Sequence, residues 1–249
     1  MILVAGGTGR LGRLVVHRLA DRGLPVTVLT RDPDRAAGLP AEVLVGDVRR
    51  PLAFGQVDVV VSAVHGFAGP GGGTPQTVDR DGNANLVDAA KAAGADVVML
   101  SVQGAAADHP MLLHRMKCAA EEHLRASGIP WTVVRATAFR ELWVELLGRS
   151  RRPLVFGVGD NPINFVPVDE VAALVERAVI DRSLRGQVLE AGGQNLTFNQ
   201  LAATVRPEAP RHVPPFALKV LARVAPPALA RQAEAALAMD TIDLTWSRD

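Results

Sequence analysis

Apolar residues in this sequence form short runs that alternate with longer amphipathic segments. Short apolar runs bounded by turn residues are typical of strands buried on both faces, as in parallel sheets. The segments between them have the length and apolar spacing of helices. The pattern therefore predicts an α/β protein with a parallel sheet. Its strands are predicted at 2–5, 25–30, 41–46, 57–64, 95–101, 130–135 and 187–190.

The predicted helices end at recognisable stop signals. Helices at 78–93 and 111–127 are each followed by a glycine, which favours a helix C-terminus. Apolar residues at 139–148 also have helical spacing, and we expect them to be core residues first and a substrate wall second. Short helices are expected at 199–205 and 216–224, between prolines. Asp169 is a candidate N-cap for the helix that opens near it.

A glycine turn directly follows the first apolar run. The sequence GGTGRLG at 6–12 places Gly6, Gly9 and Gly12 between a predicted strand and a predicted helix at 13–21. In dinucleotide-binding proteins such glycines allow the sharp turn, the close approach of a pyrophosphate and tight packing of the helix. The pyrophosphate would lie at the helix N-terminus, where free N–H groups favour negative charge. The alternative is a purely structural turn.

Residues after the second strand bear on the choice of cofactor. An acidic group near this position selects NAD through the ribose 2′-hydroxyl, whereas an arginine accommodates the 2′-phosphate of NADP. Thr30 and Arg31 end the strand here, with no carboxylate until Asp32, and Arg10 in the glycine turn adds a positive charge. We therefore favour NADP (NADPH) over NAD. Under the alternative, the arginines are solvated and Asp32 accepts from a ribose hydroxyl.

Further candidates lie at the ends of later strands, where open parallel sheets bind ligands. Asp47 is placed to accept from an adenine amino group, with Val48 packed on the ring, although a plain turn aspartate fits equally well. His65 follows the fourth strand and is a candidate acid or base, or a histidine bonded to its loop. Ser101 ends the fifth strand. The glycine-rich stretch at 66–77 is interpreted as a loop beside the cleft and a candidate lid.

Composition limits the classes of function. The 249 residues are 48% hydrophobic and carry a formal net charge of +1, so nothing in the charge favours nucleic acid or an anionic membrane as a partner. No apolar run has the length of a membrane span. The single cysteine, Cys118, excludes an internal disulfide and fits a reducing compartment. The N-terminus enters the first strand directly, so we expect a cytoplasmic protein without a signal peptide, and no metal site is predicted.

Several motifs resemble the atypical short-chain dehydrogenase/reductase superfamily, and its NmrA-like and triphenylmethane-reductase-like branches in particular. They are GGTGRLG at 6–12, Arg31, VDRDGNANLVDAA at 78–90, KCAAEEHLRASGIPWTVVR at 117–135 and NFVPVDEVA at 164–172. The resemblance implies a doubly wound Rossmann sheet of order 3-2-1-4-5-6-7. It also implies that 1–249 form a single NAD(P)-binding domain. A small C-terminal substrate lobe would be built from about 138–165 and 192–249.

The resemblance also assigns roles by position. The turn would hold the pyrophosphate, and Arg31 the 2′-phosphate. Asp47 and Val48 would hold adenine. Lys117 would bond the nicotinamide ribose. The residues of the turn are Gly6, Thr8, Gly9, Arg10, Leu11 and Gly12. The residues implied around the nicotinamide and its ribose are Ala63, Val64, His65, Ser101, Ala136, Thr137 and Phe139.

One departure from this family concerns the chemistry. Ordinary members use a Tyr-x-x-x-Lys pair in which the tyrosine transfers the substrate proton. Leu113 stands four residues before Lys117, and the chain contains no tyrosine. This puts ordinary carbonyl reduction and sugar epimerisation in doubt. Lys117 and Ser101 remain the catalytic candidates. The candidate proton donors are Ser101, His65, His109 and His114, and the spacing selects none of them.

Two functional hypotheses follow. The first is an NADPH-dependent reductase of a small conjugated acceptor, such as a quinone, enone or dye, which is apolar or planar. Such acceptors can take hydride with the proton supplied by water or a modest donor. The second is a non-catalytic NAD(P)-binding redox sensor or regulatory protein. Epimerase or lyase chemistry is a third and weaker alternative. The long helix at 111–127 leaves monomer and homodimer open.

Overall fold

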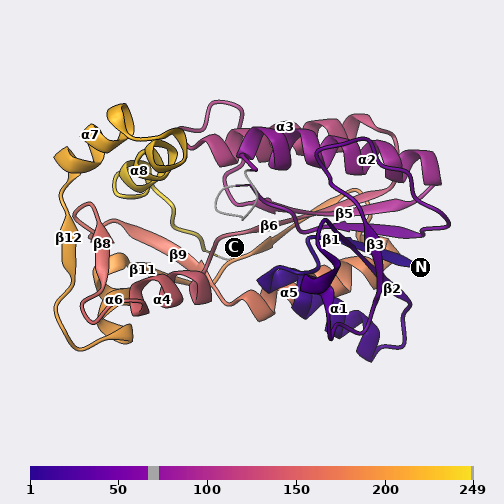
Figure 1. The fold of residues 1–249 in the computed structure, drawn as a ribbon, viewed down its shortest axis with the longest axis horizontal. Coiled ribbons are helices and arrows are strands. Elements are labelled where there is room, and N and C mark those ends of the chain that lie inside the picture. Colours follow the sequence, from indigo (N-terminus) through magenta and orange to yellow (C-terminus); the bar gives the residue numbers. More distant parts are fainter. Residues whose placement is uncertain (67–72, 248–249) are drawn as a thin grey trace. The chain divides into compact units, whose positions relative to one another are not determined.

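The computed structural model describes residues 1–66 and 73–247 (Figure 1). The chain forms two compact units. The first unit comprises Met1–Ala136 and Val168–Ala191, and the second comprises Thr137–Pro167 and Gly192–Asp249. Half of the stretch at 66–77 that was interpreted as a lid, residues 67–72, lies outside the described residues.

A seven-stranded parallel sheet organises the first unit. Its order is β10-β6-β5-β4-β1-β2-β3, which confirms the doubly wound arrangement, with β10 as the seventh strand. β1 and β4 are buried along their whole length, as continuous apolar strands in a two-sided sheet should be. The strands are β1 (Ile2–Ala5), β2 (Val26–Thr30), β3 (Glu42–Val45), β4 (Val59–Ser62), β5 (Asp96–Val102), β6 (Trp131–Ala136) and β10 (Gln187–Ala191).

Helices cover both faces of this sheet (Figure 1). α1 (Arg10–Asp21) and α5 (Val168–Ile180) pack together on one face, and α2 (Asp81–Ala93) and α3 (Leu112–Ala126) pack together on the other. One turn of π-helix, Pro75–Arg80, leads into α2. Short 3-10 helices lie at Pro33–Ala36 and Arg182–Leu184.

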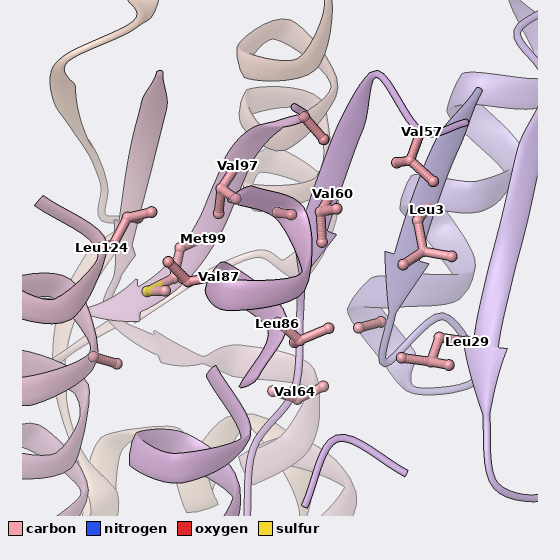
Figure 2. Packing of buried hydrophobic residues seen from close by; sticks show 14 of the residues in the cluster. Leu3, Leu29, Val57, Val60, Val64, Leu86, Val87, Val97, Met99 and Leu124 are labelled. Carbon is pink, nitrogen blue, oxygen red and sulfur yellow. The ribbon is translucent and has the colours of Figure 1, made fainter. Parts of the chain in front are cut away.

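The core of the first unit lies between the sheet and α2 and α3 (Figure 2). Val60, Val97 and Met99 from the strands meet Leu86 and Leu124 from the helices, and all five are fully buried. The apolar face predicted for the segment 78–93 therefore packs on the sheet, although α2 itself begins only at Asp81. Burying these side chains fixes the carboxyl ends of the strands, where the candidate residues lie.

The second unit contains two small sheets. In the first, β9 (Pro162–Val166) pairs with β11 (Gln194–Thr197) in antiparallel fashion and with β7 (Ala138–Phe139) in parallel fashion. In the second, β8 (Leu154–Phe156) pairs with β12 (Arg211–Val213). The helices are α4 (Arg140–Gly148), α6 (Phe198–Val205), α7 (Pro215–Val224) and α8 (Pro227–Met239).

The structure corrects two predictions made from helical pattern. α5 begins at Val168, so Asp169 lies inside its first turn, and the Asp169 carboxylate binds Arg18 on α1 at 2.8 Å instead of capping. In α4, Leu147 is buried, whereas Leu142 and Leu146 are 40% and 37% exposed, so this segment supplies less core than its spacing predicts.

Within the described residues, no helix is both long and apolar enough to cross a membrane. The same part of the chain holds no group of three or more side chains arranged to bind a metal ion.

Candidate functional site

The glycine turn joins β1 to α1 with very little space between backbones. Gly6 has φ +83°, a left-handed conformation, and a Cβ there would lie 2.5 Å from the Ala63 carbonyl oxygen. A Cβ on Gly12 would lie 2.1 Å from the Gly6 carbonyl oxygen. The Gly9 N–H donates to that same oxygen at 3.0 Å. These contacts explain why glycine stands at both ends of the turn.

Gly9 has a different environment from Gly6 and Gly12. It is exposed, and a Cβ on it would meet only the Gly6 carbonyl oxygen, at 3.3 Å. Gly9 is also the N-cap of α1, and as a glycine it makes no side-chain hydrogen bond to the N–H groups of that first turn. A side chain at Gly9 would cover this helix end. The turn therefore fits an anionic group seated on the N-terminus of α1.

The other residues expected in the turn differ in how far they are exposed to solvent. Arg10 is exposed, Thr8 is half-buried, and Leu11 is buried beneath the turn. The Thr8 carbonyl oxygen accepts from Arg13 Nε at 3.3 Å, which fixes the turn from the helix side.

Arg31 and Asp47 follow neighbouring strands at the edge of the sheet. Thr30 pairs with Val45, and the Gly46 N–H donates to the Thr30 carbonyl oxygen at 2.9 Å. The Asp47 carboxylate binds the Arg49 guanidinium at 2.6 Å. That bond lowers the pKa of Asp47, and the positive charge of Arg31 lowers it further. The Asp47 carboxylate is thus an ionised acceptor between two arginines.

Asp32 is the alternative acidic group at the end of β2. Its carboxylate accepts from the Asp34 N–H at 3.1 Å and caps the short 3-10 helix at Pro33–Ala36. The side chain thereby serves the turn, while the Arg31 side chain remains exposed.

Val48 is held by the start of α2. Asn85 Nδ2 donates to the Val48 carbonyl oxygen at 2.8 Å, and a Cβ on Gly82 would lie 2.9 Å from the Val48 side chain. Val48 packs against the main core, as a residue that forms a fixed apolar wall should.

The segment after β4 passes close to the glycine turn. Ala63 contacts Gly6, and the next residue, Val64, is buried. The Gly66 N–H donates to Asp79 Oδ2 at 2.8 Å. The pKa of His65 is lowered, mainly because the ring is desolvated. The negative charge of Asp79 opposes this effect, and the positive charge of Lys117 adds to it. The end of this segment, at Gly66, is therefore held by Asp79, a residue that the sequence did not single out.

Lys117 lies in α3 and is buried against the segment that follows β4. Its ammonium group donates to the carbonyl oxygens of Val64 and Leu100, both at 3.0 Å, and lies 3.2 Å from Asp79 Oδ1. The contact with Asp79 is an ion pair without hydrogen-bond geometry. An ammonium has three donors, and two of them are bonded to these carbonyl oxygens. Lys117 thus connects the ends of β4 and β5 to the π-helix turn.

Ser101 is buried in a second polar cluster. Its hydroxyl donates to Glu121, whose carboxylate also accepts from Arg135 and Arg125, each at 2.7 Å. Burial alone would raise the pKa of Glu121, but the bonds from Arg135 and Ser101 overcome it and lower that pKa. The Ser101 proton is therefore committed to a fixed carboxylate.

The last three candidates lie at the end of β6 and directly after it. Ala136 ends that strand in the first unit and is buried. Thr137 and Phe139 belong to the second unit, where Thr137 Oγ1 donates to Asn164 Oδ1 at 2.8 Å.

Sequence reasoning missed the buried polar residues that hold this region together. Ser62 at the end of β4 donates to Asn83, and Asn83 Nδ2 donates to the Asp79 carbonyl oxygen at 2.7 Å. Asp79 and Glu121 are fully buried. The sequence signal that could have revealed them is their spacing. Asp79 and Asn83 are one helical turn apart, and so are Lys117 and Glu121.

Comparison with known proteins identifies the family. A family described as NAD(P)H-binding matches residues 6–179, well over half of the 249 residues. The chain belongs to the NAD(P)H-binding family. The expectation of a dinucleotide-binding fold family is confirmed, and the matched span contains the glycine turn, Arg31, Asp47, Lys117 and Ser101.

Two curated relatives of this NAD(P)H-binding chain have different roles. It is 29% identical over 226 residues to the NAD(P)H azoreductase of Xenophilus azovorans, covering 86% of this chain and 75% of that protein. It is 28% identical over 200 residues to the photosystem II assembly factor Ycf39 of Guillardia theta. That alignment covers 75% of this chain and 62% of Ycf39.

Among solved structures, the fold is similar to that of the triphenylmethane reductase of Citrobacter sp. in complex with NADP(H). The TM-score is 0.78 at 22% identity, and the alignment covers 100% of this chain and 92% of the reductase.

Proposed function

We propose that this protein is an NADPH-dependent reductase that transfers hydride to a small conjugated acceptor. The observation that carries the proposal is the glycine turn over a helix N-terminus whose N-cap is an exposed glycine, in a chain of the NAD(P)H-binding family. The azoreductase among its relatives and the dye reductase of similar fold support a reductase of a planar acceptor.

The residues of the first unit fit the parts of the cofactor. Gly6 to Gly12 would hold the pyrophosphate, and Arg31 would meet the 2′-phosphate through a charge-assisted hydrogen bond. Asp47 would accept from adenine, and Val48 would form the wall beside it. The exposed Arg31 and the turn-bound Asp32 favour NADPH over NADH. When bound, the reduced nicotinamide supplies the hydride, while the protein supplies orientation.

Lys117 and Ser101 would act in this scheme as positioning residues. Lys117 fixes the carbonyl groups of Val64 and Leu100, and Ser101 is held by Glu121. Both would shape the nicotinamide end of the site without transferring a proton. The contact of Lys117 with the nicotinamide ribose stays a prediction, because two of the three ammonium donors are bonded to the Val64 and Leu100 carbonyl oxygens and the ammonium also pairs with Asp79.

A non-catalytic NAD(P)-binding protein is the second candidate. The observations that favour it are Leu113 in the place of the tyrosine and the engagement of Ser101 and Lys117 by protein groups. The relative that is an assembly factor agrees with such a role.

One experiment separates the two candidates. NADPH oxidation is followed by loss of nicotinamide absorbance with an azo dye, a quinone, an enone and a cationic triphenylmethane dye, and NADPH affinity is titrated in parallel. Acceptor-dependent oxidation supports the reductase. Binding of NADPH without turnover of any acceptor would contradict it and favour the second candidate. Gly9→Val, which should bind no NADPH, serves as the control for unspecific oxidation.

A further inference from the structure

The inner face of α3 carries three buried polar side chains: His114, Lys117 and Glu121. Lys117 and Glu121 are satisfied by fixed protein partners, as described above. Within the described chain, His114 Nδ1 is sealed from solvent and has no hydrogen-bond partner. Buried polar atoms are almost always paired, so an unpaired one calls for an explanation. His114 also lies one residue after Leu113, which stands where family members carry tyrosine.

The His114 ring is held rigidly in place. It stacks on the His109 ring with centroids 3.9 Å apart and planes 9° apart, and it packs against Gly104 in the loop after β5. His109 is itself fixed, because its Nδ1 accepts from the Met111 N–H at 3.1 Å. Arg115 donates to the His109 carbonyl oxygen at 2.7 Å. Such a supporting shell is typical of a side chain that must be placed accurately.

The ring is also kept neutral. Burial and the neighbouring His109 lower the pKa of His114 to about 3. A neutral imidazole carries one N–H, and a buried lone pair without a partner costs less than a buried N–H without one. This favours a proton on Nε2, which is not among the sealed atoms, and leaves Nδ1 as the unpaired acceptor.

We propose that His114 Nε2–H donates a hydrogen bond to the carbonyl oxygen or azo nitrogen of the acceptor during reduction. The proposal rests on the reductase function. The acceptor gains a hydride, with its electron pair, from the reduced nicotinamide, and negative charge develops on the oxygen or nitrogen. The Nε2–H stabilises that charge, and water then supplies the proton that neutralises the product. His114 thus performs the part of the tyrosine that does not require an acid.

The choice of acceptor provides an internal test. A quinone or enone becomes an anion when it receives hydride, so a fixed hydrogen-bond donor should accelerate its reduction. A cationic triphenylmethane dye becomes neutral when it receives hydride, so the same donor should have no effect. Removing the donor should therefore slow the reduction of the quinone or enone and leave the reduction of the dye unchanged. A general loss of structure would slow both.

The variants are His114→Phe, which keeps a planar ring for stacking, and His114→Gln, which retains an N–H donor. For His114→Phe we expect kcat for the quinone to fall about 10²–10³-fold, the range for loss of one oxyanion donor. KM, NADPH affinity and turnover of the cationic dye should change less than about twofold. His114→Gln should recover part of the quinone rate. His123→Phe, at an exposed site on the same helix, should behave as wild type.

A readout other than activity is the ¹⁵N spectrum of the His114 ring, assigned with His114→Phe. Adding a quinone to the NADP⁺-bound protein, in which no hydride is available, should shift the Nε2 resonance. An unchanged spectrum, or equal loss of quinone and dye turnover in His114→Phe, overturns the role of His114. In both cases wild-type turnover still supports the reductase. Wild-type protein that binds NADPH but reduces nothing overturns both proposals. If His114→Phe does not fold, the comparison rests on His114→Gln and on the spectrum, which His114→Gln then serves to assign.

Discussion

Lys117 and Asp79 form an ion pair that is almost completely buried. The distance between Lys117 Nζ and Asp79 Oδ1 is 3.2 Å, and the two side chains are 3% and 0% exposed. Asp79 lies in the π-helix turn and Lys117 in α3, so the pair connects segments 38 residues apart in sequence, 117 minus 79. The same pair holds the residues after β4, through the Val64 carbonyl oxygen and the Gly66 N–H.

Breaking this pair on one side should destabilise the protein strongly. Asp79→Asn leaves the Lys117 charge buried without an opposite charge, and such a loss costs about 3–5 kcal/mol. Lys117→Met leaves the Asp79 charge in the same position. The double variant removes both charges, so its loss of unfolding free energy should be well below the sum of the single losses. Urea denaturation of all four proteins measures this coupling.

An exposed pair serves as the control. Glu145 in α4 and Arg149, the C-cap of that helix, lie four residues apart and form an ion pair at 3.0 Å, with the Arg149 and Glu145 side chains 65% and 47% exposed. The equivalent cycle, Arg149→Met with Glu145→Gln, should give a coupling of only about 0.3–0.5 kcal/mol. Equal coupling in the two cycles would show that burial does not set the strength of the Lys117–Asp79 pair.

Arg31 should determine the preference between the two dinucleotides. Arg31→Ala removes a charge-assisted hydrogen bond to the 2′-phosphate, worth about 1.5–3 kcal/mol, or roughly 10–100-fold in affinity. NADPH binding should weaken by that factor, while NADH binding should change little, because NADH lacks the phosphate. Fluorescence titration of both dinucleotides checks this. Arg223→Ala, at an exposed site in α7, should alter neither affinity, and equal losses for both dinucleotides would contradict the role of Arg31.

The sequence predicted the first unit well because its signals are local. Apolar runs locate the seven strands of the parallel sheet, and glycine after a helix marks its end, as at Gly94. The second unit was predicted less well. β8 and β12 contain three residues each, too few for a periodic pattern to appear. α8 begins at Pro227, directly after Pro226, and is rich in alanine, so its apolar face is weakly marked.

The candidate site was predicted in position but not in its bonding. The glycine turn and Arg31 are found from neighbours in the sequence alone. The partners of Lys117 and Ser101 are Asp79 and Glu121, and these depend on how α3 packs against β5 and the π-helix turn. Tertiary packing decides which side-chain donor is already bonded to a protein group and which is available to a ligand. For this reason the spacing could not distinguish His114 from Ser101 as the proposed donor to the acceptor.

The glycines of the turn should differ in what their replacement removes. Gly9→Val should abolish NADPH binding in a folded protein, because its side chain covers the exposed N-terminus of α1. Gly12→Ala should instead destabilise the fold by about 3 kcal/mol or more, since its Cβ would lie 2.1 Å from the Gly6 carbonyl oxygen. Gly55→Ala is the control: nothing lies within 4 Å of that Cβ, so stability should change by less than about 1 kcal/mol. Thermal unfolding and NADPH titration separate these outcomes, and NADPH binding by Gly9→Val would remove the turn from its proposed role.

Glu121 should make stability depend on pH in the acidic range. Although burial opposes it, bonds from Arg135 and Ser101 lower the pKa of Glu121 below its usual value, and an unfolded glutamate titrates near pH ~4.3. The ionised carboxylate therefore contributes its full stability above that pH. The contribution is lost as the pH falls through the lower pKa of the folded protein. Glu121→Gln lacks it at every pH.

We thus expect Glu121→Gln to be clearly less stable than wild type at neutral pH, with a difference that shrinks as the pH falls below about 4. Urea denaturation at a series of pH values measures that difference. Glu122→Gln is the matched control, because Glu122 is the next residue on α3 and is exposed, so it should track wild type throughout. A difference that stays constant down to acid pH would show that the Glu121 carboxylate is not the stabilising ion, and that shape alone explains its burial against Ser101 and Arg135.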